Sequence, residues 1–335
     1  MYSGMPTTQS GTFNMTTISI SSSLEKIGDA NSGYPSKAFD RFCDALPRFQ
    51  QMAAATYGAD VNMYSAAVMI PAFLETYTGS GRGSMDLIPS LTKLLPNWTV
   101  RYTGLSKLKW FNEHFKSVTL NHSYKSIFSV GNYTSSSETG SLLGWHVPTV
   151  SINESFSPLI GADVTFLNNL TLKAEYRRTR VLNLSMTSVQ INESRSSDWV
   201  IGLGYKINDF RLFSGKTSRK IKKAQRGSRR NNQQQEQQSA SSSRKTGVNH
   251  DLNLRLDFTL RDQAAITRDI ATRTSSASSG NSALKISFMA DYTLSRLMTL
   301  SAYYERQTNK PLLSSSSYPT TTRDFGLSLK FSLTR

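Results

Sequence analysis

Most of the chain alternates between apolar and polar residues with a period of two. In residues 118–130 the side chains at every second position are mostly apolar, and those between them are mostly polar. The same pattern recurs in residues 170–176, 252–260, 284–292 and 325–333. Because successive side chains of a β-strand point to opposite faces, each segment predicts a strand with one apolar and one hydrophilic face.

Three features of these segments favour a transmembrane β-barrel. The segments commonly reach about ten residues or more, which suffices to cross a bilayer at a tilt, whereas soluble strands average about five or six. Charges of both signs lie in the middle of the hydrophilic faces, which suits a water-filled lumen. Aromatic residues gather toward segment ends, as interfacial girdles require: Trp98, Tyr133, Trp145, Trp199, Tyr205, Tyr304 and Phe331.

We therefore predict an all-β membrane protein of about ten antiparallel transmembrane barrel strands with a small helical region. A soluble β-protein with its apolar face turned inward remains an alternative, because it produces the same alternation. The residues expected to face lipid are Leu120, Tyr124, Phe128, Leu170, Leu172, Leu254, Leu256, Phe258, Ile286, Phe288, Leu327, Leu329 and Phe331. The residues expected to face the lumen are Lys173, Glu175, Arg177, Arg255, Asp257, Lys285, Asp291 and Glu305.

One segment, residues 36–57, has a helical rather than an alternating pattern. Its apolar residues recur at steps of three and four, Ser36 can cap its start and Gly58 can end it. Pro47 is expected to kink this helix or to split it in two.

Turn residues and composition then divide the chain. Short turns are predicted at residues 110–115, 167–169 and 294–297, and longer connections at the opposite ends of the strands, at residues 133–147, 187–197, 272–281 and 308–322. The resulting regions are a first strand region (1–23, with the strand at 12–22), a helix-containing extracellular loop or cap (24–96), transmembrane strands (97–207), a basic disordered loop (208–249) and C-terminal transmembrane strands (250–335).

The positive charge is concentrated in one segment. The chain has 39 Lys+Arg and 23 Asp+Glu, a formal net charge of +16. Residues 214–249 hold ten Lys/Arg and only Glu236 as an acid, a net of +9, so all other residues carry +7. This segment has no aromatic residues on which bases could stack, so nucleic acid is not an expected partner. A solvated linker and attraction to an anionic surface both remain open.

Candidate chemistry is sparse, and we expect no enzyme, no metal and no cofactor. A single cysteine, Cys43, excludes internal disulfides and thiolate-rich metal sites. The four histidines are scattered without ligand spacing. The strand acids, including Glu154 and Asp163, are expected to be solvated lumen charges rather than acid–base pairs. Residues 1–11 do not form a secretory signal.

Six stretches carry a resemblance to a known family: IPAFLETYTG (70–79), LPNWTVRYTGLSKL (95–108), SVTLNHSYKSIFSVGNY (117–133), INESFSPLIGADVTFLNNLTLKAEYRRTR (152–180), WVIGLGYKINDF (199–210) and SSSYPTTTRDFGLSLKFSLTR (315–335). They resemble the C-terminal end of the SprA/Sov family, the outer-membrane translocon of the Bacteroidota type IX secretion system, which is also needed for gliding motility.

The resemblance implies the last strands of a very large barrel in the bacterial outer membrane, whose pore passes folded cargo proteins. The partners that it implies are outer-membrane lipid, secreted cargo, a plug subunit and a small β-barrel subunit. Family members are several times longer than this chain and begin with a secretion signal. A non-transporting structural or adhesive outer-membrane barrel is the alternative function.

Overall fold

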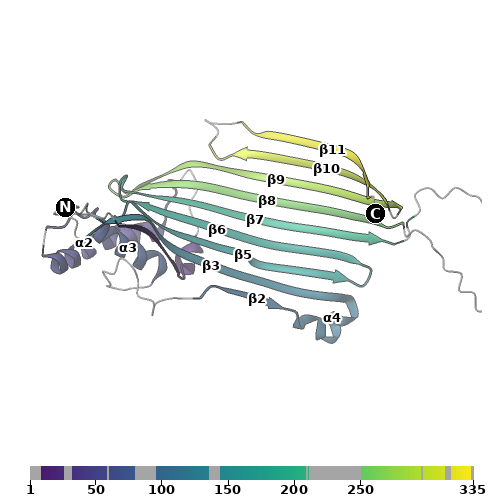
Figure 1. Ribbon diagram of the computed structural model, residues 1–335, viewed down its shortest axis with the longest axis horizontal. Coiled ribbons are helices and arrows are strands. Elements are labelled where there is room, and N and C mark those ends of the chain that lie inside the picture. Colours follow the sequence, from purple (N-terminus) through teal and green to yellow (C-terminus); the bar gives the residue numbers. More distant parts are fainter. Residues whose placement is uncertain are drawn as a thin grey trace, which may run out of the picture.

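The computed structural model describes residues 9–25, 32–58, 60–79, 96–135, 144–208, 210, 250–295, 297–313 and 318–332. Its main feature is one long antiparallel β-sheet with a group of helices against one end (Figure 1). This confirms the prediction of a mostly antiparallel β-structure with few helices. None of the described helices is both long and apolar enough to cross a membrane.

The described residues form an 11-stranded sheet. Its strands are β1 (Ser10–Thr16), β2 (Trp98–Tyr102), β3 (Phe115–Ser135), β4 (Trp145–His146), β5 (Thr149–Phe166), β6 (Leu170–Ser185), β7 (Gln190–Ile207), β8 (Leu252–Asp269), β9 (Thr274–Ser295), β10 (Met298–Pro311) and β11 (Thr320–Phe331). The order across the sheet is β1-β3-β5-β6-β7-β8-β9-β10-β11, with β2 and β4 also paired to β3. The two outer strands, β1 and β11, do not pair with each other, so the sheet is open.

Along each edge of β3, two strands lie one after the other and pair with different parts of it. β1 pairs with residues 127–134 of β3, and β2 pairs with residues 120–124 along the same edge. β4 pairs with the end of β3 in the register that β5 continues. Three of the described helices lie between β1 and β2 in the sequence, and two short ones lie between β2 and β3.

The helices are α1 (Ile20–Ser23), α2 (Lys37–Tyr57), α3 (Ala66–Thr78), the 3-10 helix η3 (Gly104–Lys107) and α4 (Lys109–His114). α2 confirms the predicted helix: the Ser36 hydroxyl accepts a hydrogen bond from the Phe39 N–H, and Gly58 ends the helix in a left-handed conformation. α2 is continuous through Pro47, so of the two expectations, a kink or a split, the split is wrong. α3 was not predicted, because it is apolar on almost every side and has no clear helical period.

α2 and α3 pack on one end of the sheet and bury the main hydrophobic core there. Phe42, Phe73 and Tyr77 form its aromatic centre, with ring centroids 4.9 Å apart for Phe73–Tyr77 and 6.3 Å for Phe42–Phe73. Strand residues such as Phe128 and Leu184 complete the core from the sheet side. The rest of this sheet face is not covered by these helices.

Several predicted boundaries are wrong. The strand predicted at residues 12–22 ends at Thr16, after which the chain turns across the sheet into α1. The short turn predicted at 110–115 is largely the helix α4. The predicted long connections at 187–197 and 272–281 are turns at 186–189 and 270–273, because the polar residues that follow continue as paired strand. Most of the basic segment, residues 211–249, lies outside the described residues.

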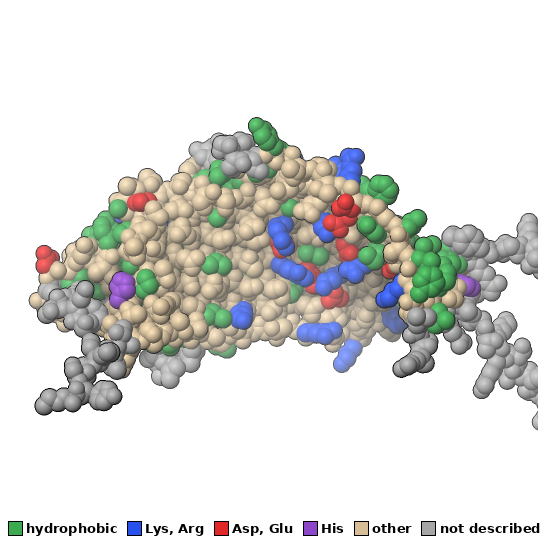
Figure 2. Space-filling view, turned by 45° about the horizontal axis from the view of Figure 1, so that its top comes forward, with side chains coloured by type: hydrophobic (Ala, Val, Ile, Leu, Met, Phe, Trp, Pro, Cys, Tyr) green, Lys and Arg blue, Asp and Glu red, His purple; other side chains and the backbone are tan. Residues whose placement is uncertain are grey.

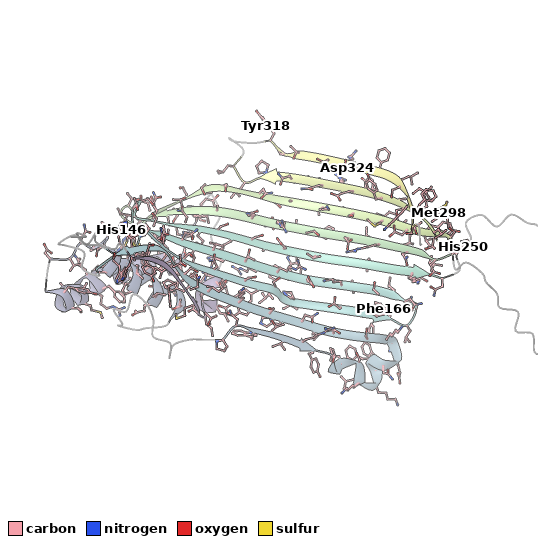
Figure 3. All side chains as sticks on the ribbon, viewed as in Figure 1. His146, Phe166, His250, Met298, Tyr318 and Asp324 are labelled. Carbon is pink, nitrogen blue, oxygen red and sulfur yellow. The ribbon has the colours of Figure 1, made fainter. Side chains whose placement is uncertain are left out.

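The two ends of the sheet differ. Figure 3 places Phe166, His250 and Met298 at the end of the sheet away from α2 and α3, and His146 at the end beside α2 and α3. The predicted tight turns at 167–169 and 294–297 both lie at the end away from α2 and α3, between β5 and β6 and between β9 and β10.

Candidate functional site

The pairing register sorts the predicted lipid-facing and lumen-facing residues onto opposite faces of the sheet. Residues that pair directly across strands point to the same face. One such row runs across six strands: Leu172, Leu203, Leu256, Phe288, Tyr304 and Phe325. Following these rows places all thirteen expected lipid-facing residues on one face, here called the belt face. All eight expected lumen-facing charges lie on the other, here called the charged face.

The half of the belt face away from α2 and α3 exposes a continuous set of large apolar side chains, here called the apolar belt. Its members are Trp199, Ile201, Leu203, Tyr205, Leu256, Phe288, Tyr304, Phe325, Leu327, Leu329 and Phe331. Leu256 is 39% exposed in the middle of the sheet, and Phe325 is 82% exposed on the outer strand. Soluble monomers rarely expose a contiguous apolar surface of this extent.

Aromatic rings border the apolar belt on the side of the helices. Tyr176 of β6 and Trp199 of β7 pair across the strands and stack, with ring centroids 4.5 Å apart and an interplanar angle of 30°. On the same face, the next pair along these strands toward α2 and α3 is Arg178–Ser197. The belt face therefore changes from apolar to polar within one row of residues.

The charged face carries ion pairs of both signs. Lys173 Nζ lies 2.8 Å from Glu175 Oε1, and Arg177 contacts the other oxygen of that carboxylate. On neighbouring strands, the Arg255–Asp257 and Lys285–Glu305 pairs are each 2.7 Å long. The cationic partners are between 45% and 69% exposed, so these pairs add little stability and form a surface in contact with water.

A shallow hollow of about 610 Å³ lies among these charges. Figure 2 shows the acidic and basic side chains gathered on one half of this face. Gly202 and Gly204 form part of its floor, where added Cβ atoms would lie 3.0 Å from Asp257 Oδ1 and 2.5 Å from Thr171 Oγ1. The glycines thus leave room for the polar side chains of the adjacent strands.

Two residues expected to face lipid are wrongly assigned. Tyr124 and Phe128 lie on the belt face, but both are buried by the chain itself. The Tyr124 hydroxyl accepts a hydrogen bond from the Ser19 N–H (2.8 Å), and Phe128 belongs to the core beneath α2 and α3. Their alternation resembles that of Leu120, and only the long-range packing of the helices distinguishes them.

The expectation for Glu154 is also wrong, since this acid is on the belt face and not on the charged face. It is buried with Arg180, with side chains 1% exposed and charged atoms 3.1 Å apart. Ser19 Oγ and Tyr124 Oη both donate to Glu154 Oε1, at 2.9 and 2.8 Å. Arg180 donates to the hydroxyl of Ser22 at 2.9 Å. This cluster ties the segment before α1 and α1 itself to the sheet.

A second buried cluster lies beside the first. Arg268 donates to Glu193 (Nε to Oε2, 2.9 Å) and to the Tyr34 carbonyl (2.8 Å). Arg195 contacts the same Glu193 carboxylate and donates to the Glu25 carbonyl at 2.9 Å. Sequence reasoning missed both clusters, although charges at positions that are apolar elsewhere in the same strands were a usable signal.

Among the described residues, no three His, Cys, Asp or Glu side chains gather in a group that could hold a metal ion. Cys43 is buried in α2, and burial raises the pKa of its thiol to about 11. The features of the described residues are therefore the apolar belt, the charged face and the buried ion pairs that attach the N-terminal segment to the sheet.

Neither a family model nor any curated protein matches this chain.

Proposed function

We propose that this sheet is a wall segment of an outer-membrane β-barrel, the C-terminal part of a protein-conducting translocon of the SprA/Sov kind. One observation carries the proposal: in the uncovered half of the sheet, an exposed apolar belt lies directly opposite a hollow lined by charges. In a barrel wall the apolar belt contacts lipid and the charged face contacts water. A soluble sandwich would cover the apolar belt with a second layer.

The strand lengths support this proposal. β3, β5, β7, β8 and β9 have 21, 18, 18, 18 and 22 residues. About 9–11 residues cross the hydrocarbon core at a tilt. The remaining length of the strands extends beyond the bilayer at the end beside α2 and α3, which we assign to the cell exterior.

The charged face would act in transport as a hydrated lining. Paired charges such as Lys173–Glu175 and Lys285–Glu305 nearly cancel one another, so the wall would hold water without strongly retaining a cargo of either sign. No bond is made or broken in such a role. The partners in this proposal are membrane lipid, exported proteins and the other subunits of a secretion machine.

A matched pair of variants tests the assignment of the two faces. Leu256→Arg, on the apolar belt, is expected to destabilise the membrane-inserted protein by about 2–4 kcal/mol and to remove it from the outer-membrane fraction. Asn253→Arg, at the charged hollow of the same strand, is expected to fractionate like the unaltered chain. The measurement is outer-membrane content after a high-salt wash.

Two results would contradict the proposal. Release of the unaltered chain by salt would identify a peripheral protein. Equal loss of both variants would mean that the two faces do not meet different solvents. A completed barrel that contains this chain and passes no exported protein would instead favour the structural or adhesive alternative.

A further inference from the structure

We propose that the cationic side chains just beyond the aromatic border of the apolar belt bind the phosphate groups of anionic membrane lipids. The inference rests on the proposed function, because it places this border at the level of the lipid headgroups. Aromatic girdles occupy that level in membrane barrels, so the next polar row meets the headgroups.

A pocket marks the site on the belt face. It has a volume of about 590 Å³ and lies where the apolar belt meets Glu25, which follows α1. Tyr176 of the aromatic border forms one side, and Arg178 and Lys310 contribute cations from β6 and β10. A single row of paired residues joins them: Arg178, Ser197, Asp262, Ser282 and Lys310.

The two cations are available for a ligand. Among the described residues neither Arg178 nor Lys310 forms an ion pair, and Arg178 makes one long contact of 3.5 Å with the Glu25 carbonyl. The Glu25 carboxylate is bound to Arg41, which leaves Asp262 as the acid of the row. The pocket therefore keeps an excess of positive charge beside an aromatic surface.

A second pair of cations lies on the outer strands, two rows nearer the apolar belt than Lys310 and in the row of Ile201, Phe258 and Ile286. Arg306 of β10 and Arg323 of β11 pair directly across the strands on the belt face, one row beyond Tyr304 and Phe325. Both are exposed, and in the described part of the chain neither has an acidic partner. Like charges directly opposite one another destabilise a sheet unless an anion lies between them.

Phosphate suits both places. Guanidinium groups bind phosphate oxygens through two parallel hydrogen bonds, and a lysine ammonium adds a point charge. A lipid phosphate has a further advantage over free phosphate, because its acyl chains can lie on the adjacent apolar belt. The structure therefore fits a phosphate held at the end of two apolar chains.

The test measures which lipid the full chain retains. The chain is reconstituted in vesicles of phosphatidylcholine with a minor fraction of phosphatidylglycerol, floated, extracted in mild detergent and analysed for bound lipid by native mass spectrometry. The double variant Arg178→Gln/Lys310→Gln is expected to lower retention of phosphatidylglycerol about fivefold for each cation removed. Lys173→Gln/Lys285→Gln, with the same loss of charge on the charged face, is expected to retain it fully.

Each other outcome has a distinct meaning. A chain that does not float with the vesicles overturns the proposed function and this inference with it. A chain that floats without preferring phosphatidylglycerol, or two double variants with equal losses, overturns this inference alone. Displacement of phosphatidylglycerol by inorganic phosphate at matched ionic strength would show a free-anion site and overturn the lipid assignment.

Discussion

At the scale of single residues, the most constrained charges are those buried beneath the N-terminal segment. The side chains of Glu154 and Arg180 are shielded from solvent, and besides each other they form hydrogen bonds with Ser19, Ser22 and Tyr124. Replacing a buried pair by apolar residues is often harmless, whereas removing one member leaves an uncompensated charge. The clusters therefore make the attachment of the helices sensitive to single substitutions.

Arg180→Gln is expected to destabilise the folded protein by about 3–5 kcal/mol, because Glu154 then keeps a buried charge without its cation. Denaturant unfolding of the chain in detergent measures the loss. Arg177→Gln, in the same strand but with an exposed side chain on the charged face, is the control and should cost about 1 kcal/mol or less. Similar losses for the two variants would contradict the burial of Arg180.

Cys43 gives a second prediction at this scale. Because burial raises the pKa of its thiol to about 11, little thiolate exists at pH 8, and the sulfur is also shielded. Maleimide should therefore leave Cys43 unlabelled in the folded protein and label it fully after unfolding. A cysteine placed in an exposed turn by Ser188→Cys should react at once. Rapid labelling of Cys43 in the folded chain would show that α2 detaches readily.

At the scale of elements, the helices α2 and α3 depend on their aromatic contact. Phe73 is fully buried between Phe42 and Tyr77. Phe73→Ala is expected to cost about 3–5 kcal/mol through lost burial and the cavity that remains. The measurement is the unfolding midpoint of the helical signal. Gln51→Ala on the exposed side of α2 should change stability by about 0.5 kcal/mol or less, and an equal effect would contradict the packing.

The alternating pattern was sufficient to predict the strands and their two faces, because a strand's period of two depends only on neighbouring residues. α2 was predictable for the same reason, from its cap and its period. α3 was not, since burial on nearly all sides removes the contrast between its faces. The burial of Phe128 was also not predictable, because it depends on helices that are distant in sequence.

At the scale of the whole molecule, the sheet has two unpaired edges. One is formed by β1 and β2 together and the other by β11. Figure 1 shows β11 at the opposite side of the sheet from β2. In hydrocarbon each unpaired backbone group costs several kcal/mol, so in the proposed barrel further strands would pair with both edges.

The chain alone is therefore expected not to form a stable pore. Refolded in planar bilayers, it should give no steady single-channel conductance, and its gel mobility in detergent should not change on heating in the manner of a closed barrel. The control is any self-sufficient outer-membrane porin treated in the same way. A steady, large conductance from this chain would contradict the open sheet.

The strand order also determines which additional strands could close this sheet into a barrel. The strands of the described chain occupy nine positions, counting β1 with β2 and β4 with β5, and every neighbouring pair is antiparallel. The first and ninth positions consequently run in the same direction. Pairing between these two strands would therefore be parallel. If a second copy lay beside the first in the same orientation, its first strand would also pair in parallel with the ninth strand of its neighbour. Bacterial outer-membrane barrels have an even number of antiparallel strands. An odd number of strands from outside the described sheet is therefore needed to complete a barrel around it.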